Sequence, residues 1–76
     1  MSKFTKTYNV NVNQKQRDAL SRAFKVCAQY FLNEKNTDVE VIVSSFDDKR
    51  IIANLKVSGA IIESRIIGQN GGLTLV

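Results

Sequence analysis

The chain has 76 residues and a mass of 8.5 kDa, and 43% of its residues are hydrophobic while 24% are charged. A chain of this size buries only about 60% of the surface that its unfolded form exposes, so we expect a thin core. The length excludes a two-domain enzyme and a doubly wound cofactor-binding fold, and the composition is that of a globular domain rather than a disordered tail. Residues 1–76 are therefore expected to form a single domain.

The residue types that build most catalytic and metal sites are scarce. The sequence has no His and a single Cys, which excludes Ser-His-Asp and Cys-His arrangements and an intrachain disulfide. The adjacent Asp47 and Asp48 fall in a predicted turn, where Asp is frequent for backbone reasons, and are weak support for an ion site. We therefore expect no enzyme activity, no catalytic residues, no cofactor, no metal and no small-molecule substrate.

The positive charge is concentrated at the start of the chain. The formal net charge is +4, yet residues 1–25 hold six basic and one acidic side chain, whereas residues 26–76 hold five basic and six acidic ones. Such asymmetry marks surfaces for nucleic acid or another anionic partner. A net charge of about 2–8 also keeps a small domain soluble, so both interpretations stay open.

A half-buried strand is predicted at the start of the chain. Residues 4–12 alternate between apolar and polar side chains, and Lys6 falls on the apolar side with Phe4 and Tyr8. A period of two with aromatic and β-branched residues is typical of a strand with one face on a core. Asn13, with Gln16 three residues later, then forms a variant of the capping box that begins a helix.

A helix of about twenty residues is predicted from Gln14 to about Lys35, because apolar residues recur there at the helical period. Asn36 tolerates the left-handed backbone conformation that ends many helices. The apolar stripe consists of Leu20, Phe24, Cys27 and Phe31. We expect the Cys27 thiol to pack as a small hydrophobe rather than to react.

The second half of the chain is predicted to be β structure. Strands are expected at 38–46, 50–57 and 60–67, separated by a polar turn at 47–49 and by a reversal at Ser58-Gly59, where glycine supplies the unusual backbone angles. A turn at 69–72 leads to a short edge strand at 73–76. The order β-α-β-β-β, with a short terminal β, predicts a two-layer α+β fold in which one amphipathic helix packs on a mostly antiparallel sheet of four to five strands.

One helix, about 10 Å across, cannot cover both faces of such a sheet. We expect the helix side to carry Val39, Val41, Val43, Ile51, Leu55 and Val57, and the reverse side to carry isoleucines. An open antiparallel face is usually polar, and a large apolar patch on a small domain often marks an interaction surface. The predicted partner-binding residues are Ile42, Phe46, Ile52, Ile61 and Ile67. The alternative is that the isoleucines are scattered, or that the C-terminal strand folds over them.

These patterns predict a small non-enzymatic protein-interaction module of the accessory or inhibitor type. It would bind a protein partner, or form a homodimer, through the isoleucine-bearing face, since a two-fold dimer needs only one self-complementary patch. The size suits many small accessory proteins, including those carried by phages, an association of size class alone. No apolar segment resembles an export signal or a membrane span, so we expect a cytoplasmic protein without a membrane partner.

Nucleic-acid binding is the alternative function. The predicted helix carries four basic residues that could lie against phosphates: Lys15, Arg17, Arg22 and Lys25. The predicted open face lacks the aromatic platform of single-strand RNA readers, and no helix-turn-helix or zinc module is present in the sequence.

Overall fold

The computed structural model describes residues 2–75; Met1, Val76 and the side chain of Leu75 lie outside this description, and so does the end of the predicted strand 73–76. The elements, in chain order, are β1 (Phe4–Tyr8), α1 (Gln14–Gln29), η1 (a π-helical turn, Tyr30–Glu34), β2 (Val39–Ser45), β3 (Arg50–Val57), β4 (Ala60–Gly68) and β5 (Leu73–Leu75). This order confirms the predicted one.

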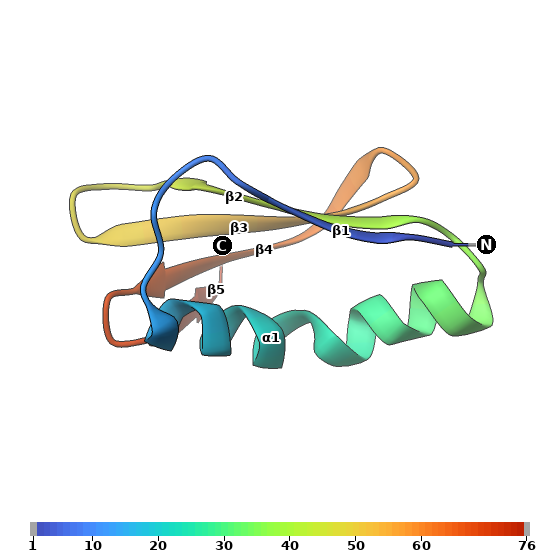
Figure 1. Cartoon of the computed structure of the whole chain (residues 1–76), viewed down its shortest axis with the longest axis horizontal. Coiled ribbons are helices and arrows are strands. Elements are labelled where there is room, and N and C mark those ends of the chain that lie inside the picture. Colours follow the sequence, from blue (N-terminus) through green and yellow to red (C-terminus); the bar gives the residue numbers. More distant parts are fainter. Residues whose placement is uncertain (1, 76) are drawn as a thin grey trace.

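The strands form one mixed sheet whose order follows the sequence, β1-β2-β3-β4-β5. β1 runs parallel to β2, and every other neighbouring pair is antiparallel. The helix lies on one side of this sheet only (Figure 1). The predicted two-layer α+β fold with a mostly antiparallel sheet is therefore confirmed.

The first strand is shorter than its sequence pattern predicts. β1 ends at Tyr8, and the Asn9 N–H makes one more bond to the Val43 carbonyl (2.8 Å) before the chain leaves the sheet for the helix layer. Val10 and Val12 still pack against the core as half-buried side chains. Alternation reports which side chains face the core and does not require that the backbone is paired, so the predicted strand over 9–12 is wrong.

The helix begins with the predicted capping box. The Asn13 Oδ1 accepts the Gln16 N–H (2.8 Å), and the Gln16 Oε1 accepts the Asn13 N–H (3.0 Å). Each side chain thus satisfies a backbone donor that the first turn leaves without an internal partner. Gln16 is buried, and this reciprocal pair explains how a polar side chain is accommodated there.

The helix ends in a wider turn than an α-helix allows. α1 passes into η1, which ends at Glu34, and Asn36 adopts a positive φ of 49°, as predicted for the residue that stops the helix. In an unbroken α-helix Leu32 would lie about 120° around the axis from Leu20. The wider turn changes this angle, and both Phe31 and Leu32 pack against the core.

The core lies between α1 and the middle strands. Leu20, Phe24 and Ala28 supply the helix side. The sheet side is made of Val39, Val41, Val43, Ile51, Ala53, Leu55, Val57 and Ile67, all buried. The residues that the sequence predicts beneath the helix are therefore all in place.

A bulge in the β3–β4 pair corrects one prediction. Leu55 is opposite Glu63, but Lys56 is opposite Ile61, so Ile62 is an extra residue in β4. In a regular strand Ile61 and Ile67 would share a face, as the sequence analysis assumes. The extra residue reverses the alternation. Ile61 lies on the open face, whereas Ile67 lies in the core with no exposed surface, so its assignment to a partner-binding face is wrong.

The last strand extends the sheet and does not cover it. β5 pairs with β4 at the sheet edge, with Leu73 opposite Ile67 and Thr74 opposite Ile66. The alternative in which the C-terminal strand folds over the isoleucines is therefore wrong for the residues that the structure describes.

The capping box gives a stability prediction. We expect Asn13→Ala to lower the free energy of unfolding by about 1 kcal/mol, because the Gln16 N–H loses its acceptor. Asn11→Ala is the matched control, since Asn11 is exposed and lies outside the cap. Urea denaturation followed by circular dichroism measures both, and an equal loss in the two variants would contradict this role of Asn13.

Candidate functional site

The sheet face away from α1 carries three neighbouring isoleucines. Ile52 of β3 is directly opposite Ile66 of β4, and Ile42 of β2 is diagonal to Ile52. Ile42 and Ile52 are half-buried, and Ile66, which the sequence analysis does not include among the partner-binding residues, is only 8% exposed. No helix within residues 2–75 lies on this side (Figure 1).

Polar side chains between these isoleucines bond to one another. The Thr7 hydroxyl donates to the Glu40 carboxylate (3.3 Å), the Asn9 side-chain amide donates to the Ser44 hydroxyl (3.4 Å), and the Ser64 hydroxyl donates to the side-chain Oδ1 of Asn54. Each pair bridges neighbouring strands, which lowers the cost of removing these groups from water. We call this surface, with Ile42, Ile52 and Ile66 at its centre, the open face.

Two exposed apolar residues lie at the ends of the open face. Ile61, opposite Lys56, is 57% exposed. Phe46 lies just past the end of β2, is 45% exposed, and has the Arg50 guanidinium 4.9 Å from its ring centroid. Four of the five predicted partner-binding residues, Ile42, Phe46, Ile52 and Ile61, therefore belong to one face.

Asp47 fixes Arg50 beside Phe46. Its carboxylate accepts the backbone N–H groups of Lys49 (2.9 Å) and Arg50 (2.8 Å), and it accepts the Arg50 Nε–H (2.7 Å). The Arg50 side chain is the main cause that lowers the pKa of Asp47, and the Lys49 N–H adds to it. The carboxylate thus closes the β2–β3 hairpin, the turn role that the sequence predicts for it.

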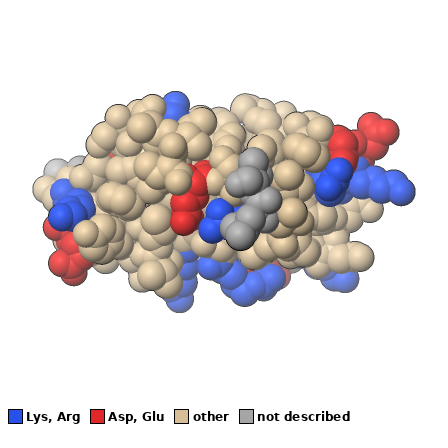
Figure 2. Space-filling model, turned by 180° about the vertical axis from the view of Figure 1, so that it is seen from behind, with Lys and Arg blue, Asp and Glu red and all other residues tan. Residues whose placement is uncertain are grey.

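The four basic residues predicted to bind nucleic acid do not share one surface. Lys15, Arg22 and Lys25 are exposed on α1, whereas Arg17 is turned to β1, with its guanidinium 5.0 Å from the Tyr8 ring centroid. Figure 2, the view from behind, shows basic groups gathered along the lower margin, where Figure 1 places the helix. The surface above them is largely uncharged.

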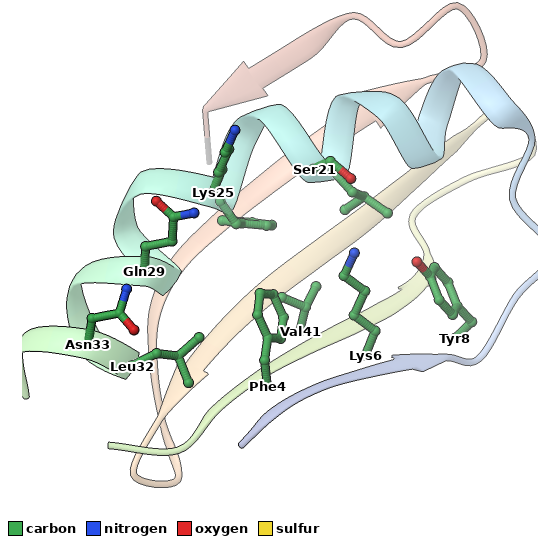
Figure 3. Close-up of a pocket in the computed structure, with 11 residues that line it drawn as sticks. Phe4, Lys6, Tyr8, Ser21, Lys25, Gln29, Leu32, Asn33 and Val41 are labelled. Atoms are coloured by element: carbon green, nitrogen blue, oxygen red, sulfur yellow. The ribbon is translucent and has the colours of Figure 1, made fainter. Parts of the chain in front are cut away.

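A groove between β1 and α1 is a hollow that the sequence analysis missed. It has a volume of about 580 Å³ and an apolar floor of Phe4, Leu20, Phe24, Leu32 and Val41. Figure 3 shows Lys6 and Tyr8 on the β1 side and Ser21, Lys25, Gln29 and Asn33 on the helix side. The only sequence signal for it is Lys6, a charged residue on the apolar side of the first strand.

The groove exists because α1 is held toward the other edge of the sheet. The Asn13 amide donates to the Gln69 carbonyl (3.0 Å), which ties the β4–β5 turn to the start of the helix. In that turn Gly71 has a φ of +83°, and a Cβ there would lie 3.0 Å from the Lys15 carbonyl oxygen. Only glycine allows this close approach without strain. A single helix drawn toward β4 and β5 leaves the flank over β1 open.

Cys27 lies on the flank of α1 near β4. Its side chain is half-buried against the core, and burial, followed by the nearby Glu63 carboxylate, raises the pKa of the thiol. A raised pKa leaves little thiolate, the reactive form. This agrees with the predicted packing role.

Neither a metal cluster nor a membrane span is found in the described chain. Within residues 2–75, no three His, Cys, Asp or Glu side chains gather as metal ligands would. No helix in that range combines the length and the apolar content needed to cross a bilayer. No protein-family model matches the chain, and comparison with curated proteins and with solved structures finds no match.

The Asp47 geometry predicts a pH dependence. The folded state lowers the pKa of this carboxyl below its ordinary value of 3.8, so the stability it contributes is present above that value and is lost as the pH falls toward the folded pKa. Carbon-detected NMR titration should show the lowered pKa in the native protein and a return toward 3.8 in Arg50→Ala. Lys49→Ala keeps the backbone N–H that donates to Asp47 and should change the pKa of Asp47 little. A native pKa at or above 3.8 would contradict the geometry.

Proposed function

We propose that this protein is a non-enzymatic protein-interaction module whose open face binds a protein partner, in the simplest case a second copy of the chain. The observation that carries the proposal is the group of adjacent isoleucines, Ile42, Ile52 and Ile66, on a sheet face that no helix covers. Burying the exposed parts of Ile42 and Ile52 would contribute roughly 25 cal/mol for each Å² of apolar surface removed from water.

The size of the face supports a modest interface. Five strands about 4.8 Å apart, with about six residues each on average, give a face of about 19 by 21 Å, an area of about 400 Å². This is smaller than the roughly 800 Å² that each partner contributes to a standard interface. A stable contact would therefore include Phe46 and Ile61 at the ends of the face, both of which are already exposed.

The charges of the face favour self-association over repulsion. Glu40 lies directly opposite Lys56 across the β2–β3 pair, so the face carries both signs side by side. A two-fold dimer requires one patch that complements itself, and a mixed-charge rim around an aliphatic centre meets that requirement.

Charged substitutions at the centre of the face test this proposal. We expect Ile52→Asp to convert a dimer to a monomer in analytical ultracentrifugation at low micromolar concentration, because the carboxylate would be buried without a partner. Ile42→Thr, which keeps the branched shape, should weaken the dimer about tenfold while the fold persists in circular dichroism. Asn11→Asp adds the same charge on the exposed segment between β1 and α1, outside the face, and is the control.

A monomeric native protein would overturn the homodimer. A foreign protein partner would then be supported only if a captured partner loses binding to Ile52→Asp and keeps binding to Asn11→Asp. If both variants associate as the native chain does, the open face is not the binding surface.

The exposed basic residues of α1 are the second candidate function, contact with nucleic acid phosphates. Lys15 and Arg22 are exposed on the helix, which Figure 2 shows as the side where basic groups gather. We expect binding of a short duplex to fall steeply between about 50 and 200 mM salt, and to be lost in the double variant Lys15→Glu with Arg22→Glu. Lys56→Glu, on the open face, is the matched control. Fluorescence anisotropy measures all three, and binding that ignores salt would contradict this function.

A further inference from the structure

β1 presents unpaired backbone groups at an edge of the sheet. It is the first strand in the sheet order and has a neighbour, β2, on one side only. The Lys3 carbonyl and the Asn9 N–H both bond to β2, at Val39 (2.9 Å) and at Val43 (2.8 Å). Backbone groups of alternate residues in a strand point to opposite sides. The odd-numbered residues of β1 therefore pair with β2, whereas Phe4, Lys6 and Tyr8 direct their N–H and C=O groups outward.

The same three residues place their side chains in the groove between β1 and α1. Phe4, Lys6 and Tyr8 share a face with Val39, Val41 and Val43, the side toward the helix. All three line the groove (Figure 3). A strand added to the free edge would thus hydrogen-bond to the backbone of these residues and point every second side chain to the helix side, beside the groove.

The groove is apolar at its floor and positive at its rim. Phe4 is 43% exposed, although it faces the helix layer. The Lys6 Nζ lies 5.6 Å from the centroid of the Phe4 ring, and Lys25 stands on the opposite wall. Arg17 adds a positive charge beside Tyr8 at one end. The residues that line the groove include Lys6 and Lys25 and no Asp or Glu.

We propose that β1 accepts an extended segment of another protein as a sixth strand, with an acidic side chain between Lys6 and Lys25. Apolar side chains on either side of it would lie opposite Phe4 and Tyr8. Backbone hydrogen bonds provide affinity in this mode of recognition, and the alternate side chains provide specificity. The site is separate from the open face, and its occupancy does not depend on the function proposed above.

A second copy of β1 is a poor occupant of the same edge. In an antiparallel pair centred on Lys6, the two lysines would be directly opposite, and like charges in that position are destabilising. A lysine on an edge strand is also a common protection against pairing between copies. An acidic side chain turns this repulsion into attraction, so the charge selects a foreign strand. The other edge, β5, has only three residues.

A synthetic heptapeptide tests the proposal. The sequence Thr-Leu-Thr-Glu-Thr-Leu-Thr, with blocked ends, presents Leu, Glu and Leu on one side, and it has the same pattern in either direction. We expect this peptide to bind the full chain, measured by NMR titration, and the version with Lys in place of Glu to bind about tenfold more weakly. Lys6→Glu in the protein should reverse that preference. Lys49→Glu, in the exposed turn between β2 and β3, should leave it unchanged.

Amide exchange distinguishes strand addition from other modes of binding. In the free protein we expect fast exchange at the Phe4, Lys6 and Tyr8 N–H groups and slower exchange at Thr5 and Thr7. The Glu peptide should slow exchange at Lys6 and its even-numbered neighbours. A peptide methylated at alternate backbone nitrogens, so that it cannot donate to β1, should lose this protection.

Four results would overturn the proposal. The first two are that the peptide does not bind, or that it binds without slowing amide exchange at Lys6. The third is that Lys6→Glu does not reverse the preference for the Glu peptide over the Lys peptide. The fourth is that amide exchange at Lys6 slows as the protein concentration rises in the absence of peptide. The last would identify a second copy as the occupant.

Discussion

One helix must shield a sheet that is about twice as wide as itself, and most features of this protein follow from that mismatch. A helix of about 10 Å packs on a five-stranded sheet about 19 Å wide, so one face of the sheet has no helix and one flank of the other face is only partly covered. The tie between Asn13 and Gln69 and the close approach of Gly71 decide which flank it is. They hold α1 toward β4 and β5 and leave the side chains of β1 beside a groove.

The sequence predicts most of the fold because its patterns report burial directly. The period of the helix and the alternation of the strands identify Leu20, Phe24, Val41 and Leu55 as core residues, and the Asn13–Gln16 pair marks the helix start. The bulge at Ile62 was not predictable, since one extra residue leaves no mark in hydrophobicity but moves Ile67 from one face to the other. The groove depends on where the helix sits across the sheet. The one sequence signal for the groove is Lys6, a charged residue among side chains that face the core.

The open face and the β1 edge differ in the physics of the contacts that they offer. The open face presents aliphatic side chains among polar groups that already hydrogen-bond to one another. Its contribution to the free energy of binding therefore comes from the apolar area that it buries and from its shape. The β1 edge presents unpaired backbone donors and acceptors, with two lysines beside an apolar floor. Its contribution to the free energy of binding therefore comes from directional hydrogen bonds and from charge. The groove beside β1 and the open face lie on opposite faces of the sheet, so the side chains that contact an added strand in the groove differ from those on the open face. Their variants can therefore be interpreted independently.

The parallel pairing of β1 with β2 has a consequence for the order in which the chain assembles. Tight turns join β2, β3 and β4, whereas 30 residues of sequence lie between Tyr8, the last residue of β1, and Val39, the first residue of β2. Closing a long loop costs more entropy than closing a short one, and contacts distant in sequence slow folding. The meander of β2, β3 and β4 is thus the natural nucleus, and β1 is the strand that docks last. By the same reasoning, transient local opening of the native protein begins at its N-terminal strand.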